Sequence, residues 1–169
     1  MNREKQNKVR SGAASSKQKS GKRKNKRNLI SGELSLKVRP QSQHRHRARK
    51  AGNRIIMYDP SSRDKERFKE QCEEYAPKRP LEGAICVCMV FNMPRPKSHY
   101  RSGRYSHLLK NDALPYPIVK PDLDNIIKFY LDSMTGLFWK DDAYVCSIEA
   151  SKCYKNEGSV EIEYWNYPE

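Results

Sequence analysis

The sequence predicts one α+β domain, residues 31–169, preceded by a basic tail, residues 1–30. Three observations support this division. Apolar runs of strand length recur along the domain, two longer segments have helical periodicity, and the tail contains almost no large apolar residue. A domain of this size is expected to form a single hydrophobic core.

The positive charge is concentrated in the tail. The whole chain has a net charge of +14, and residues 1–28 contain 11 Lys or Arg against one acid, which leaves +4 for the remaining 141 residues. A segment this polar cannot bury enough apolar surface to fold alone, so we expect the tail to be disordered. It suits non-specific contact with nucleic acid through counterion release, although a solubilising terminus is the alternative.

The composition also bears on location. No apolar run approaches the roughly 20 residues of a membrane span, and the first residues have no secretory pattern, so we expect a cytoplasmic protein without membrane contact. Five cysteines without an export signal predict reduced thiols rather than disulfides. Cys86 and Cys88 share one face of an apolar run, which favours buried thiols over a zinc pair.

Five runs have the length and apolar pattern of β-strands. The run 84–91, AICVCMVF, is the best candidate for a central strand, and 143–151 and 159–165 are predicted to form an antiparallel pair joined by KNEG. The other two runs are 34–38, LSLKV, and 55–58, IIMY.

Two segments are predicted to be helices. Residues 61–76 contain good helix formers with one narrow apolar stripe of Phe68, Cys72 and Tyr75, which would dock on a sheet. The second segment follows residue 122 and is amphipathic, with Gly136 as its natural end. Its apolar residues are Leu123, Ile126, Ile127, Tyr130, Leu131 and Met134.

Two basic segments are candidates for DNA contact. Residues 39–54 are predicted to form a basic hairpin loop, and residues 92–119 a long loop with four prolines in which cations alternate with aromatic rings. A solvated turn and a loop disordered without ligand are the respective alternatives. The candidate DNA-binding residues are Arg39, Arg45, Arg47, Arg49, Lys97, Tyr100, Arg101 and Arg104.

Acidic residues mark both sides of the second helix. Asp122 and Asp124 precede it in a segment that, if extended, would direct both carboxylates to one point, with Asp124 as the N-cap. Asp141 and Asp142 follow it, and the chain could return one of them beside the helix start. Converging carboxylates suit Mg²⁺ or Mn²⁺. From spacing alone, helix caps, an ordinary turn and an ion pair of Asp124 with Lys128 remain alternatives.

This region contains three short motifs, KPDLDNIIK, LDSMTG and FWKDD. They occur in the order found in the RusA family of crossover junction endodeoxyribonucleases, which the chain resembles over about residues 34–164. The resemblance implies a two-layer α+β sandwich, a mixed sheet with helices packed on it, that acts as a homodimer in bacterial or phage-infected cells, near the nucleoid.

Position by position, the resemblance implies that Asp122, Asp124 and Asp142 are catalytic metal ligands, that Lys128 is a catalytic lysine, and that Asp141 is a less certain ligand. The implied activity is Mg²⁺- or Mn²⁺-dependent hydrolysis of four-way DNA junctions by symmetric paired nicks that leave 5′ phosphates and 3′ hydroxyls. A non-catalytic module that binds DNA or RNA, in which the aspartates only cap helices, is the alternative.

Overall fold

The computed structural model describes residues 30–167 and confirms the α+β class. The basic tail, for which disorder is predicted, lies outside the described residues. The sheet has four strands in the order β1-β6-β4-β5, with β4 parallel to β5 and antiparallel to β6. The bounds of its strands are Ser31–Leu36 for β1, Ile85–Pro94 for β4, Val145–Lys155 for β5 and Ser159–Asn166 for β6.

The predicted pairing of the last two strands is wrong. β5 and β6 are joined by a short turn, yet they lie on either side of β4 rather than next to each other. The reason is the apolar composition of β4, in which Ile85, Val87, Met89 and Phe91 are buried. A strand this apolar is most stable with a hydrogen-bonded neighbour on each edge.

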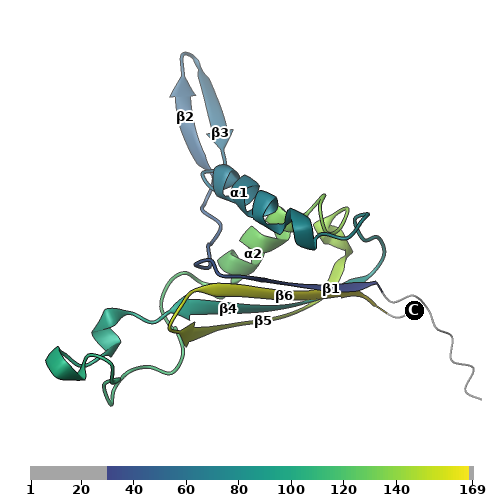
Figure 1. Cartoon of the computed structure of the whole chain (residues 1–169). Coiled ribbons are helices and arrows are strands. Elements are labelled where there is room, and N and C mark those ends of the chain that lie inside the picture. The colour runs from purple at the N-terminus through teal and green to yellow at the C-terminus, as the bar shows by residue number, and fades with distance from the viewer. Residues whose placement is uncertain (1–29, 168–169) are drawn as a thin grey trace, which may run out of the picture.

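Both helices cover the same face of the sheet (Figure 1). They are α1, Ser62–Cys72, and α2, Leu123–Met134. The predicted stripe on α1 is confirmed, because Phe68 and Cys72 are buried in the core. Helix α2 runs antiparallel to β5, since its entry contacts the end of that strand and the chain after it returns to the strand's beginning.

A basic hairpin is present as a separate two-stranded sheet that projects from the body (Figure 1), but its first strand lies within residues 39–54, the segment predicted to be its loop. It consists of β2, Arg47–Ala51, and β3, Arg54–Tyr58, and every residue of both strands is exposed. Gly52, with a φ of 61°, makes the turn. Within the described part of the chain, no helix is long and apolar enough to cross a membrane.

Candidate active site

Asp122, not Asp124, occupies the N-cap position of helix α2, without a capping hydrogen bond from its side chain. Asp122 has an extended backbone, with φ −71° and ψ 144°, and the helix begins at Leu123, so Asp124 lies in the first helical turn. The expected N-cap at Asp124 is therefore wrong, because the chain turns helical directly after Asp122. The Asp122 carboxylate makes no hydrogen bond within the described residues, whereas Asp124 Oδ1 accepts one from Asn125 Nδ2 at 3.4 Å.

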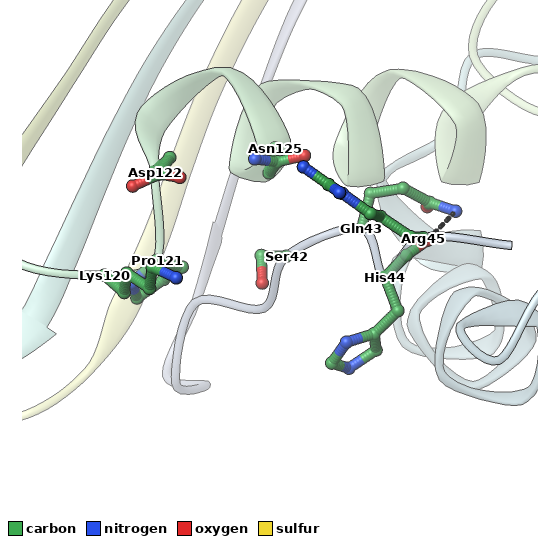
Figure 2. Close-up of a pocket in the computed structure, with 8 residues that line it drawn as sticks. All are labelled: Ser42, Gln43, His44, Arg45, Lys120, Pro121, Asp122 and Asn125. Carbon is green, nitrogen blue, oxygen red and sulfur yellow. Dashed lines mark hydrogen bonds between the residues drawn. The ribbon is translucent and has the colours of Figure 1, made fainter.

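An open, polar pocket of about 600 Å³ lies beside the start of α2. One wall is the entry to α2 and the other is the chain that leads into the hairpin. In Figure 2, Asp122 lies at the helix start, and Arg45 and Asn125 point toward one another. The lining residues are Ser42, Gln43, His44, Arg45, Lys120, Pro121, Asp122 and Asn125.

Three hydrogen bonds hold the second wall against the helices. Gln41 N donates to Tyr130 Oη at 3.1 Å, and Gln43 N donates to Asn125 O at 2.8 Å. His44 N donates to the buried Ser61 Oγ at 2.9 Å. Burial raises the pKa of Tyr130, so its hydroxyl stays protonated and available for this network. These hydrogen bonds fix the second wall of the pocket against both helices.

An ion network lies behind the pocket wall. The Lys65 ammonium bridges Asp59 Oδ2 at 3.0 Å and Asp132 Oδ2 at 2.8 Å, and all three side chains are less than a quarter exposed. Burial acts to raise the pKa of Asp59, but hydrogen bonds from Gln43, Lys65 and the Ser61 amide outweigh it and hold that pKa well below its usual value. Asp59 is therefore ionised at neutral pH and, through Lys65 and Gln43, connects the base of the hairpin to the helices.

Lys128 is turned away from Asp124. Its ammonium pairs with Asp132 Oδ1 at 3.4 Å, one turn further along α2, and its side chain is 58% exposed. The possible ion pair of Asp124 with Lys128 is therefore not formed. Because this contact with Asp132 is weak and exposed, Lys128 can leave it for a phosphate at little cost.

Asp142 lies at the other end of the sheet from Asp122. The entry to α2 is tied to the end of β5, because Lys152 Nζ donates to Pro121 O at 2.8 Å, whereas Asp142 precedes Val145, the first residue of β5. The expected return of this carboxylate beside the helix start is not found within one chain. Among residues 30–167, no three His, Cys, Asp or Glu side chains form a group that could hold a metal ion.

The neighbouring acid, Asp141, is engaged locally. Asp141 Oδ1 accepts a hydrogen bond from Ala143 N at 2.9 Å and caps the short 3₁₀ turn Asp142–Tyr144. Asp142 is exposed, and its carboxylate makes no hydrogen bond or ion pair with the described residues. Of the two acids in FWKDD, Asp142 is the one whose carboxylate is available for a ligand.

The candidate DNA-binding residues gather at the end of the sheet where β4 and β5 finish. The loop after β4 and the hairpin both project from this side of the molecule (Figure 1). Arg39, Arg45, Arg47, Arg49, Lys97, Arg101 and Arg104 are exposed, and Tyr100 is half-buried with its hydroxyl bonded to Asn156 Oδ1 at 3.4 Å. The loop is partly ordered by itself, since Arg101 N donates to Leu108 O and Lys110 N donates to His99 O.

Sequence reasoning missed three residues of this site. Lys120 and Asn125 line the pocket, and both stand within the word KPDLDN, so their position in that word was the available signal. Lys152 holds the α2 entry through the carbonyls of Val119 and Pro121, at 2.9 and 2.8 Å. No local pattern marks Lys152, because its partner lies more than 30 residues away.

Comparison with known proteins defines the class of this fold and site. A family model described as Endodeoxyribonuclease RusA matches residues 37–164. The chain therefore belongs to the RusA family. It is also similar to the uncharacterized protein YqaN of Bacillus subtilis (strain 168), with 28% identity over 127 residues, which cover 73% of this chain and 87% of that protein.

Proposed function

We propose that this protein is a structure-specific endonuclease that resolves four-way DNA junctions by symmetric paired nicks. The observation that carries the proposal is the position of the family word KPDLDN, which forms the start of α2 and one wall of a polar pocket. An uncommitted carboxylate in that pocket, Asp122, is flanked by two basic projections that can contact phosphates.

The chemistry requires compensation of charge. DNA phosphates and clustered carboxylates repel each other, so an acidic site works on DNA only with cations around it. Lys120 and Arg45 line the pocket itself, and the hairpin and the loop 95–110 extend the positive charge outward. We expect binding of junction DNA to weaken steeply with salt.

The family's use of Mg²⁺ agrees with the carboxylate donors but not with their placement in one chain. Asp122 and Asp124 are hard oxygen donors of the kind that Mg²⁺ and Mn²⁺ prefer. Asp142, the third proposed ligand, lies at the far end of the sheet, so a single chain does not provide the full set. Asp122, Asp124, Asp142 and Lys128 are proposed as the catalytic residues on the strength of family membership.

The test is cleavage of a synthetic mobile four-way junction with Mg²⁺ or Mn²⁺, with linear duplex of the same sequence as the control substrate. The wild type is expected to make paired symmetric nicks in the junction alone. Asp122→Asn is expected to bind the junction without cutting it, whereas Asp64→Asn, the same change on α1 away from the pocket, should cut normally. A wild type that binds and never cuts with either metal would instead be a non-catalytic binding module.

A further inference from the structure

The hairpin of β2 and β3 carries most of its positive charge on one face. In an antiparallel pair of strands, residues directly opposite each other point to the same side. One side of the hairpin has three arginines, in the pairs Arg47 with Tyr58, Arg49 with Ile56 and Arg54 with Ala51. We call this side the basic face, and it suits contact with DNA phosphates.

The opposite side of the hairpin is mostly apolar. It consists of the pairs Ala48 with Met57 and Lys50 with Ile55, and we call it the apolar face. Ile55 is 75% exposed and Met57 is 62% exposed, compared with 41% for Ile56 on the basic face. Exposed apolar side chains that are rimmed by polar residues mark a binding surface, because their burial in a contact is favourable.

Both ends of the hairpin are fixed beside the polar pocket. Before β2, His44 lines the pocket, and its backbone N–H donates to Ser61 Oγ at 2.9 Å. After β3, the carboxylate of Asp59 accepts hydrogen bonds from Lys65 and from the amide of Ser61. Five residues of extended strand are about 17 Å long, so the hairpin stays within reach of a large molecule bound at the pocket. The molecule that enters the pocket therefore also meets the hairpin.

Charge makes a second copy of the hairpin an unfavourable partner for the apolar face. Residues 44–54 contain five Lys or Arg and no acid. Two such segments repel each other, and cations on exposed strands are a common protection against pairing of strand edges. The same cations attract a polyanion, so the apolar face has to find an apolar surface on DNA.

A branched DNA offers such a surface more readily than a linear duplex. Within a duplex the base pairs are stacked, and inserting an apolar side chain between them costs the unstacking of a step. At the branch point of a four-way junction the stack is already interrupted, so the cost is lower. Ile55 and Met57 are two residues apart on β3, about 7 Å, which matches about two base-pair steps.

We infer that Ile55 and Met57 on the apolar face of the hairpin stack on the base pairs at the branch point of a four-way junction, and that this contact selects junctions over linear duplex. The inference rests on the proposed function for the identity of the DNA. It gives the two residues a role in the choice of substrate, and it leaves the reaction itself to the carboxylates.

Adjacent serine substitutions on the two faces test this assignment. Ile55→Ser and Ile56→Ser make the same change at neighbouring exposed positions of β3, so a general effect on the hairpin would appear in both. The full-length proteins would be bound, without divalent metal so that no strand is cut, to an immobile four-way junction with 2-aminopurine next to the branch point. A linear duplex containing the same base is the control. The fluorescence of 2-aminopurine rises when its stacking on neighbouring bases is lost.

The wild type and Ile56→Ser are expected to raise the fluorescence at the branch point, and Ile55→Ser is expected to leave it nearly at the value of free junction. Ile55→Ser should also lower the preference for junction over duplex about tenfold, because a contact with the base faces is lost. Its affinity for the duplex should not change, since the arginines of the basic face remain. Ile55→Leu, which keeps an apolar side chain, is expected to restore both the fluorescence rise and the preference.

The inference is wrong if Ile55→Ser keeps the fluorescence rise and the preference for the junction, or if Ile56→Ser loses them to the same extent. Sedimentation of the same variants tests the other partner. If Ile55→Ser changes only the oligomeric state, the apolar face contacts another copy of the chain and the inference is overturned.

Cleavage by the wild type separates this inference from the proposed function. If the wild type shows the fluorescence rise but never cuts junctions with Mg²⁺ or Mn²⁺, the branch-point contact stands and the nuclease activity falls. If the wild type cuts junctions and Ile55→Ser retains full selectivity, the proposed function stands and the branch-point contact falls. A wild type that binds duplex and junction equally well overturns both.

Discussion

The two ends of the sheet are built differently although each carries part of the family motif. Where β4 and β5 finish, the surface is open, polar and basic, with a pocket, the free carboxylate of Asp122 and two projections. Where these strands begin, the chain after α2 is packed into the core, with Phe138 and Trp139 fully buried, and Lys140, Asp141 and Asp142 then return to the surface. The end where β4 and β5 finish has the features of a binding site. The end where they begin is a well-packed part of the core that presents acidic side chains at its surface.

This difference teaches that the motif does not define a site within one chain. Asp142 in the motif FWKDD follows Asp124 in the motif KPDLDN by 18 residues. Helix α2 lies between the two motifs and separates them in space. The two parts of the motif therefore lie at opposite ends of the sheet.

The largest effect on junction cleavage is expected at the end of the sheet where β5 begins. Asp142→Asn should lower the rate of junction cleavage by about a hundredfold or more, as much as Asp122→Asn, because both are proposed ligands of one metal site. Asp141→Asn is the matched control and should cost far less, since its carboxylate caps the Asp142–Tyr144 turn. A large loss in Asp141→Asn with a small one in Asp142→Asn would reverse the assignment of these two acids. Single-turnover cleavage under saturating metal measures all three.

The next largest effect is expected on stability, from the ion network of Asp59, Lys65 and Asp132 behind the pocket. Asp59→Asn should lower the free energy of unfolding at pH 7 by about 2 kcal/mol, because it weakens charged hydrogen bonds and leaves Lys65 with less compensation. Urea denaturation measures this. Glu66→Gln, on an exposed position of α1, is the control and should change little.

The lowered pKa of Asp59 also predicts that its contribution to stability depends on pH. The pKa of Asp59 is lowered in the folded protein, so its contribution is present above the unfolded value near 4 and is lost as the pH falls below it. The difference in stability between the wild type and Asp59→Asn should therefore shrink as the pH is lowered from 7 to 3. A difference that grows on acidification would contradict the assigned network.

The hairpin offers a finer comparison between its own two faces. Arg49 pairs with Ile56 and Lys50 pairs with Ile55 across the strands, so Arg49 and Lys50 lie on opposite faces. If the face with Arg47, Arg49 and Arg54 contacts DNA, Arg49→Gln should reduce the salt slope of junction binding by about one, and Lys50→Gln should leave it nearly unchanged. Equal slopes for the two variants would mean that the hairpin does not bind through one face. Fluorescence anisotropy over a range of salt concentrations measures the slopes.

The smallest effect on stability is expected for substitution of Lys128. Its exposed pair with Asp132 contributes little, so Lys128→Gln should change the free energy of unfolding by less than about 0.5 kcal/mol. A proposed catalytic role predicts that the same variant loses cleavage while keeping junction affinity. Thermal unfolding together with cleavage assays checks both, and a variant that is strongly destabilised would show that Lys128 has a structural role instead.

Local patterns predicted most elements of the fold. Both helices, the central strand and the second strand of the hairpin follow from apolar periodicity and turn residues, which act over a few neighbouring positions. The first strand of the hairpin, Arg47–Ala51, lies in a basic segment that was predicted to be loop. The neighbours of β5 and β6 could not be predicted this way, because a short turn favours a hairpin and only the burial of β4 overrides it.

The same limit applies to the site. The sequence indicated the acidic and basic residues of the site. Contacts between distant segments determine the rest, namely the N-cap position of Asp122, the hydrogen bond from Lys152 to Pro121 and the location of Asp142. Those contacts determine which residues meet, and local spacing does not contain them.

The most direct measurement is cleavage of a mobile four-way junction with Mg²⁺ or Mn²⁺, comparing the wild type with Asp122→Asn at the start of α2. The proposed function predicts paired symmetric nicks by the wild type, and binding without cleavage by Asp122→Asn. A wild type that binds the junction and never cuts it with either metal would contradict the account.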